Sequence, residues 1–178
     1  KVDVVELGFR YLPQEQFLGP YAYTTDTFID LLDIRSTLLI GVMVDAKMIL
    51  SSHFSVDDIL IKLFAPASKS PISFVRIAAH FDDLDGVQPI AKSLAALGYK
   101  VGINLMQSVG KSEEQLANAS KTVGSWDEVD LLYFADSLGS MESDEVKRIV
   151  TIIKSNWDKA LGVHAHNNKG WAVSNTLA

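Results

Sequence analysis

The sequence contains no cysteine, which excludes disulfide bonds, thiolate metal ligands and a cysteine nucleophile. It also has no apolar run of membrane-spanning length, and no signal-peptide pattern stands before its first apolar segment. Basic residues are the minority, with 16 Lys and Arg against 22 Asp and Glu and a net charge of −6. This balance argues against nucleic acid or a membrane as the main partner. Together these absences favour a cytoplasmic protein.

The remaining composition is that of a globular protein, with 48% hydrophobic and 21% charged residues in a chain of 178. Short apolar runs alternate with helical patterns along the whole chain. Runs of this kind predict parallel strands that are covered on both faces. The six predicted strands are Val2–Leu7, Leu38–Val44, Phe74–Ala79, Val101–Met106, Leu131–Ala135 and Leu161–His166.

Helix signals stand between the predicted strands. Ser112 and Gln115 have the spacing of a capping box, and Gly98 has the place of a glycine that ends a helix. The segment 13–23 contains no such pattern and is predicted to be a long irregular loop. The predicted helices are Thr27–Ile34, Ile59–Phe64, Gly86–Leu97, Leu116–Val123 and Val146–Asn156.

Two histidines, His164 and His166, lie one residue apart at the end of the last predicted strand. Residues i and i+2 of a strand point to the same face, so both rings can reach one metal ion at about 2.1 Å. The alternative is a pair of polar residues satisfied by hydrogen bonds. The segment 167–170 has the composition of a turn into a helix. The pair therefore lies at the carboxyl end of a strand, where α/β proteins hold their active sites.

Alternation within the strands separates an apolar face from a polar one. Asn104 shares a face with Gly102 and Met106, while Arg76 shares a face with Ala78 and His80. We expect the apolar faces to contact helices. The polar faces should line the inside of a barrel and converge at its carboxyl-terminal mouth.

Four segments resemble strands of a known family. The segment His164–Leu177 resembles the seventh-strand signature of the HMGL-like (DRE-TIM) metallolyases, a superfamily that includes the 4-hydroxy-2-oxovalerate aldolases. Val2–Gly8, Phe74–His80 and Tyr133–Gly139 resemble its second, fourth and sixth strands. The match covers nearly the whole chain in order, and the His-x-His-Asn element is its most specific part.

The resemblance implies a parallel (β/α) TIM-type barrel, of which residues 1–178 would form about six of the eight strands. The first and last β/α units of the domain would then be lacking, and with them the family's Arg-Asp pair on the first strand. The resemblance further implies that His164 and His166 ligate a divalent metal ion: manganese, magnesium, zinc or cobalt. Ser137 resembles the residue that grips the substrate carboxylate, unless it only caps the following turn. No general base is assigned.

The function implied by the resemblance is that of a metal-dependent aldolase or lyase. Such an enzyme cleaves or forms a C–C bond next to the carbonyl of a 2-oxo acid, as when a 4-hydroxy-2-oxo acid yields pyruvate and an aldehyde. The partner is then a small 2-oxo acid. The alternative is an incomplete barrel, inactive as this chain, or an association module. In either case, open sheet edges would allow homo-oligomers.

For each of the other polar residues, two roles are considered. Asn104 faces the inside of the barrel, where it either contacts the substrate or has no functional role. Arg10 and Asp45 end strands at the mouth, where Arg10 binds a substrate anion or is a solvated loop charge, and Asp45 has the same two readings. Glu6 and Arg76 are predicted to form an interior ion pair, with a functional role for Glu6 as the alternative. His80 is either a group near the substrate or a hydrogen-bonded core histidine.

Overall fold

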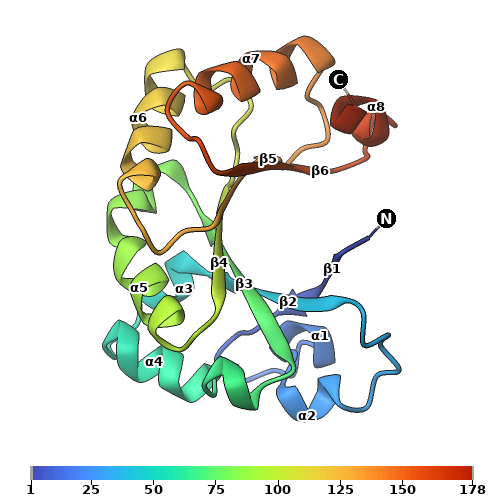
Figure 1. Cartoon of the computed structure of the whole chain (residues 1–178), viewed down its shortest axis with the longest axis vertical. Coiled ribbons are helices and arrows are strands. Elements are labelled where there is room, and N and C mark those ends of the chain that lie inside the picture. The colour runs from blue at the N-terminus through green and yellow to red at the C-terminus, as the bar shows by residue number, and fades with distance from the viewer. Residues whose placement is uncertain (1, 178) are drawn as a thin grey trace.

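A computed structural model describes residues 2–177, which form one six-stranded parallel sheet in the order β1-β2-β3-β4-β5-β6. The sheet curves into an open half-barrel (Figure 1). This confirms the predicted partial TIM-type fold, because the strands follow one another in sequence order and every neighbouring pair is parallel. The strands are β1 (Val4–Phe9), β2 (Leu39–Asp45), β3 (Ile72–Ala79), β4 (Lys100–Leu105), β5 (Leu131–Asp136) and β6 (Ala160–Ala165).

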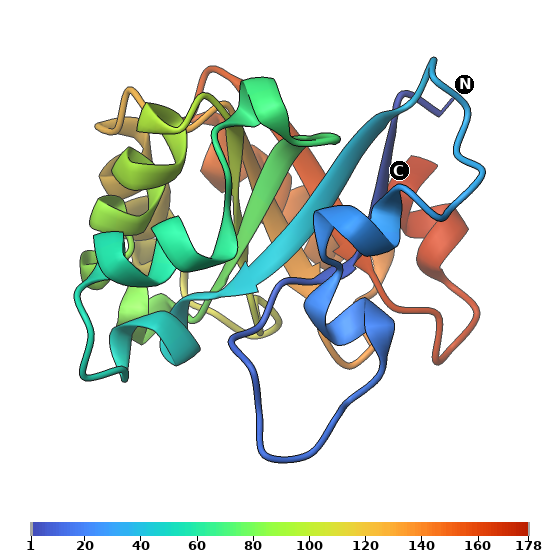
Figure 2. The ribbon, with the colours of Figure 1, turned by 90° about the horizontal axis from the view of Figure 1, so that it is seen from below.

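The longer helices cover the convex side of the sheet (Figure 1). Viewed from below, the segment between β1 and α1 projects away from the rest of the molecule (Figure 2). None of the helices in residues 2–177 is long and apolar enough to cross a membrane. The helices are α1 (Pro20–Tyr23), α2 (Asp26–Ile29), α3 (Ala46–Leu50), α4 (Val56–Leu63), α5 (Gln88–Ala96), α6 (Glu113–Gly124), α7 (Ser143–Lys154) and α8 (Ala172–Leu177), with 3-10 turns η1 (Ala67–Lys69) and η2 (Phe81–Gly86).

The capping box is present as predicted, since Ser112 Oγ accepts from the N–H of Gln115 and Gln115 Oε1 accepts from the N–H of Ser112. Two predictions near the N-terminus are corrected. The helix expected over 27–34 ends at Ile29, and the loop expected over 13–23 contains the one-turn helix α1. Proline at the first position of α1 favours that turn because its fixed φ is already helical.

The two faces of the sheet divide as the alternation predicts. On the convex side, Val75, Ile103 and Phe134 are buried in the main hydrophobic core beneath the helices. On the concave side, aromatic rings lie over glycines. A Cβ at Gly102 would lie 2.6 Å from Phe74 Cζ, and one at Gly162 would lie 2.4 Å from Tyr133 Cε1. The inner face is therefore packed by alternating large and absent side chains, as small barrels require.

Candidate functional site

The two histidine rings meet at the carboxyl end of β6. His164 Nε2 and His166 Nε2 are 3.0 Å apart, and the ring centroids are 5.0 Å apart. His164 is half-buried and His166 is exposed. Asn167 Oδ1 accepts a hydrogen bond from the N–H of Ala172, which holds the turn between β6 and α8. The rings therefore lie on the same side of the chain, as the i, i+2 spacing predicts.

The separation of the two rings fits a metal site. Two ligand atoms about 2.1 Å from one ion and at right angles to each other are about 3.0 Å apart. The same separation also fits a hydrogen bond in which one ring donates and the other accepts. No cluster of three or more His, Asp, Glu or Cys side chains able to hold a metal occurs within residues 2–177. The candidate metal ligands in this part of the chain are therefore two, both imidazoles.

Arg76 connects the histidines to the opposite edge of the sheet. Its Nε and Nη2 donate to the two carboxylate oxygens of Glu6 at 2.7 and 2.5 Å, which confirms the predicted interior ion pair. Its Nη1 lies 2.9 Å from His164 Nδ1, and its guanidinium lies 5.0 Å from the centre of the Tyr133 ring. Arg76 is 6% exposed. A single buried cation therefore contacts side chains from β1, β5 and β6.

The surroundings of His164 favour its neutral form. Burial lowers the pKa of His164 most, the charges of Arg76 and His166 lower it further, and Glu6 opposes them. Burial likewise raises the pKa of Tyr133, with Arg76 acting against it. A neutral imidazole is the form that can ligate a metal ion.

Asn104 carries a buried polar atom without a partner. The residue is 3% exposed, and its Oδ1 has no hydrogen-bond partner among residues 2–177. The strand register places Asn104 between Ala78 and Tyr133 on the concave side. A buried oxygen left unpaired costs free energy, so such atoms in native proteins call for an explanation. A ligand that donates a hydrogen bond at this point would supply one.

Ser137 follows β5 and holds the neighbouring loop. Its Oγ accepts a hydrogen bond from the N–H of Gln107 at 3.0 Å, and Gln107 has a positive φ of 56°. This bond uses a lone pair of the hydroxyl, which can still donate its proton. The turn after β5 is capped by Asp136, whose carboxylate accepts from the N–H groups of Ser140 and Met141. The alternative in which Ser137 caps that turn is therefore wrong.

Close packing brings the Ser137 turn against the histidine segment. Gly139 is buried with φ 60°, and a Cβ there would lie 2.7 Å from the backbone nitrogen of Asn168 and 3.0 Å from the His166 carbonyl oxygen. Only glycine fits both that conformation and that approach. The turn that carries Ser137 and the segment that carries His166 therefore form one surface.

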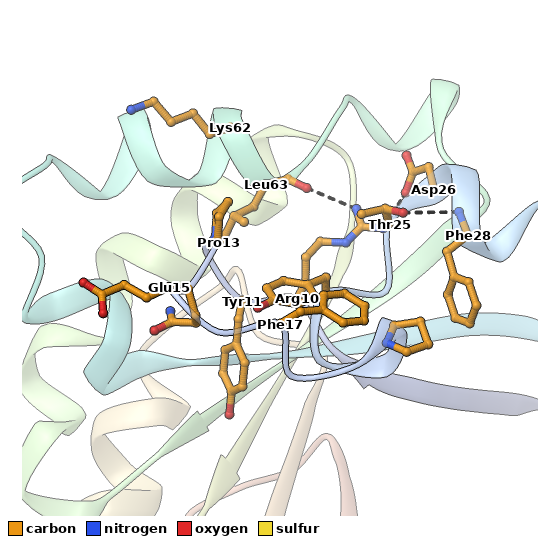
Figure 3. A pocket seen from close by; sticks show the side chains of 13 residues that line it. Arg10, Tyr11, Pro13, Glu15, Phe17, Thr25, Asp26, Phe28, Lys62 and Leu63 are labelled. Atoms are coloured by element: carbon orange, nitrogen blue, oxygen red, sulfur yellow. Dashed lines mark hydrogen bonds and ion pairs between the residues drawn. The ribbon is translucent and has the colours of Figure 1, made fainter.

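Arg10 directly follows the carboxyl end of β1, as predicted, but its side chain is bonded within the protein. Its side chain donates to the carbonyl oxygens of Thr24 and Leu63 and to the carboxylate of Asp26, as Figure 3 shows in part. Arg10 is 3% exposed, so the reading as a solvated loop charge is wrong. Because four hydrogen bonds already occupy its guanidinium, the geometry argues against the predicted role in substrate binding.

Asp45 and His80 are two further residues at strand ends for which functional roles were considered. Asp45 Oδ1 accepts from the N–H of Met48 and caps α3, which is neither of the roles considered for it. His80 is half-buried and precedes the 3-10 turn η2, without capping it. Both roles considered for His80 stay predictions.

A cavity of about 820 Å³ lies away from the histidines, beside α1, α2 and the end of α4 (Figure 3). Arg10, Tyr11, Phe17, Tyr23 and Phe28 are among its lining residues, and no histidine is. Its walls are mainly aromatic and apolar. We therefore assign the candidate chemistry to the surface around His164 and not to this cavity.

The sequence did not predict that the Tyr133 ring lies against Arg76, or that Arg76 contacts His164. The period-two pattern of β5 could have placed Tyr133 on the inner face, because it shares the even spacing of a strand face with Ser137, a predicted site residue. Nothing local in the sequence predicts which ring lies under the Arg76 guanidinium.

The fold and these residues define a class of protein: a TIM-type α/β domain whose polar side chains gather at the carboxyl ends of its strands. The family model described as HMGL-like matches residues 39–178. The chain belongs to the HMGL-like family, and the predicted resemblance is confirmed.

Curated relatives include a 4-hydroxy-2-oxovalerate aldolase from Pelotomaculum thermopropionicum, 33% identical over 112 residues, or 63% of this chain and 33% of the relative. An oxaloacetate decarboxylase from Mycobacterium tuberculosis is 30% identical over 109 residues, or 60% of this chain and 31% of the relative. The chain thus spans about a third of the length of the curated relatives that it matches.

Solved structures with the same fold include the N-terminal domain of a putative aldolase from Bacteroides vulgatus. It has a TM-score of 0.83 and 24% identity, and the alignment covers 98% of this chain and 56% of that one. The carboxyl transferase domain of Rhizobium etli pyruvate carboxylase has a TM-score of 0.67 and 11% identity, with 79% and 25% covered. At these identities the likeness concerns the fold alone.

Proposed function

We propose that this chain is the metal-binding part of a divalent-metal-dependent aldolase or lyase that breaks or forms a C–C bond next to the carbonyl of a 2-oxo acid. The observation that carries the proposal is the pair of imidazole Nε2 atoms 3.0 Å apart at the carboxyl end of β6. Membership in the HMGL-like family and aldolase relatives support the same reaction class. The substrate type is a 4-hydroxy-2-oxo acid, cleaved to pyruvate and an aldehyde.

His164 and His166 would hold the metal ion, which is manganese, magnesium, zinc or cobalt. A bound divalent ion polarises the 2-oxo carbonyl as a Lewis acid. Ser137 donates a hydrogen bond from its hydroxyl to the substrate carboxylate, because its oxygen already accepts one from the N–H of Gln107. Asn104 Oδ1 accepts a hydrogen bond from a substrate hydroxyl, which pairs the otherwise unpartnered oxygen. The general base that moves the proton of that hydroxyl is not among the residues assigned.

The absence of cysteine and the net charge of −6 support a cytoplasmic enzyme whose partner is a small molecule, and neither a nucleic acid nor a membrane. The whole of residues 1–178 would act as one HMGL-like barrel domain. The oxaloacetate decarboxylase relative favours a second candidate within the same class, loss of carbon dioxide from a 2-oxo diacid.

The test is metal content and pyruvate release in the full-length protein that contains this chain. We expect His164→Ala and His166→Ala each to abolish pyruvate release and to weaken divalent-ion binding by roughly tenfold or more, since each removes one of few protein ligands. His53→Ala is the matched control, because His53 is exposed between α3 and α4. Undiminished metal binding in the His164/His166 double variant would refute the proposal.

The competing hypothesis is a barrel part that associates with partners and is inactive as this chain. The observation in its favour is that two ligands alone, without a third His, Asp, Glu or Cys nearby in residues 2–177, make a weak metal site. Pyruvate release by the full-length protein with its metal, and its loss in the histidine variants, would show that these residues serve catalysis in the whole protein and would exclude a role in association alone.

A further inference from the structure

The contact with Arg76 determines which ring nitrogen of His164 carries a proton. Arg76 Nη1 lies 2.9 Å from His164 Nδ1. A guanidinium has only donors, so Nδ1 must offer its lone pair. A neutral imidazole has a single N–H, which is then on Nε2. His164 Nε2 therefore donates to His166 Nε2, 3.0 Å away.

Metal ligation requires the other tautomer of His164. A neutral histidine binds a metal through a nitrogen that carries no proton, and its second nitrogen donates its N–H to a neighbour. Ligation through Nε2 would place the proton of His164 on Nδ1, facing an N–H of Arg76. Two donors cannot share one hydrogen bond. The Arg76 contact and ligation by Nε2 therefore exclude each other.

Contacts with Glu6 and Tyr133 keep the Arg76 guanidinium beside His164, where it blocks metal ligation by Nε2. Glu6 accepts from its Nε and Nη2, and the Tyr133 ring lies against the guanidinium. Only Nη1 reaches His164, so the guanidinium can leave the ring while keeping a bond to Glu6. Arg76 then acts through His164 and not through contact with the substrate.

We infer that Arg76 is a positioning residue that competes with a divalent metal ion for the ring of His164, so that metal binding displaces Arg76 from Nδ1. This inference rests on the proposed metal site. It predicts that the affinity for the metal rises when the buried Arg76 is removed. It also predicts a proton that changes nitrogen when the metal binds.

The first test reads the tautomer directly, by nitrogen-15 NMR of the histidine rings in the unaltered chain. Without metal, we expect the His164 proton on Nε2 and an unprotonated Nδ1. Adding zinc should move the proton to Nδ1. Finding the proton on Nδ1 in the metal-free chain would overturn the inference, whatever the chain's affinity for zinc. This readout does not depend on a variant that folds.

The second test is a zinc titration by calorimetry on the full-length protein that contains this chain and on its double variant Glu6→Gln, Arg76→Met. The double change removes one negative and one positive charge, so the formal charge around the histidines stays the same. Zinc should bind this variant roughly ten- to a hundredfold more tightly, the range expected when a competing charged hydrogen bond is lost. Glu6→Gln alone is the control. It keeps Arg76 and should not tighten binding. Thermal unfolding checks that each variant is folded.

The outcomes separate the inference from the proposed function. Zinc binding that is equal or weaker in the double variant would overturn the competition and leave the metal site standing. Zinc binding in none of the proteins would contradict the metal site, and the inference with it. Tighter binding in the double variant, together with the Nε2 proton in the metal-free chain, would support both.

Discussion

At the scale of single residues, Asn104 is a position where a substitution should affect stability and activity in opposite directions. Its Oδ1 is buried without a partner in the described part of the chain, and this arrangement costs stability. Leucine has nearly the same shape and no polar atoms. A site built for catalysis often keeps such a cost, and removing it tends to stabilise the protein at the expense of activity.

We expect Asn104→Leu to leave the melting temperature unchanged or higher, while kcat/KM of the full-length enzyme falls roughly ten- to a hundredfold, the value of one lost hydrogen bond to substrate. Thermal unfolding and steady-state kinetics on the same variant measure the two effects. Asn118→Leu, on the exposed side of α6, is the control and should change neither. Normal kinetics in Asn104→Leu would remove the substrate role.

Ser137 is the second residue whose role can be isolated. Ser137→Ala should lower kcat/KM roughly ten- to a hundredfold with metal content unchanged, because a hydrogen bond to a carboxylate contributes about 1.5–3 kcal/mol. The variant also loses the bond to the Gln107 N–H, so its melting temperature must be measured beside its kinetics. Ser140→Ala, in the same turn, is the control. A Ser137→Ala variant that is less stable but catalytically normal would leave Ser137 a structural role only.

At the scale of elements, β5 and β6 pack closely on their inner side because an aromatic ring on β5 lies over a glycine on β6. Tyr133 and Gly162 are register partners, and the ring fills the space that a Cβ of residue 162 would occupy. His164 is two residues further along the same face of β6. The position of the histidine ring thus depends on how closely β5 and β6 pack on their inner side.

Gly162→Ala should therefore destabilise the chain by about 1–3 kcal/mol, the usual cost of an overpacked interior. Chemical denaturation measures the loss. The same change in a Tyr133→Ala background should cost much less, because the ring that it would meet is gone. Additive effects of the two changes would show that the ring does not fill that space.

The capping residues show how far nearby residues determine where a helix begins and ends. Ser112 and Gln115 are separated by two residues, and their reciprocal bonds appear as the spacing predicts. The helix expected over 27–34 ends at Ile29, although Thr25 caps its start with a side-chain hydrogen bond. Start signals lie within a turn of the residues that they affect. The end of this short helix depends on what surrounds it.

At the scale of the whole molecule, the half-barrel has two strands with one unpaired side each, β1 and β6. Apolar side chains are exposed near both: Val4 and Leu39 beside one edge, and Val173 and Leu177 on α8 beside the other. Unpaired strand edges with apolar neighbours favour pairing with another chain.

We expect this chain to self-associate with rising concentration in light-scattering or sedimentation measurements. Val4→Lys should shift it toward the monomer, because a charge on an edge strand opposes pairing. Ile61→Lys is the matched control, since Ile61 is also apolar and exposed but lies on α4, away from both edges. A strict monomer at all concentrations would contradict this prediction.

The sequence by itself determined the strands, which of their residues share a face, and the capping box of α6, because each depends on residues within a few positions of one another. It placed His164 and His166 on one face for the same reason. The tertiary structure alone decided that Arg76, 88 residues away, reaches His164 Nδ1, and that the carbonyl oxygen of Leu63 accepts a hydrogen bond from Arg10, 53 residues away. Such contacts depend on how far the sheet curves and on which side chains fill its inner face. No local pattern encodes that curvature, so the environment of the histidines became visible only in the folded chain.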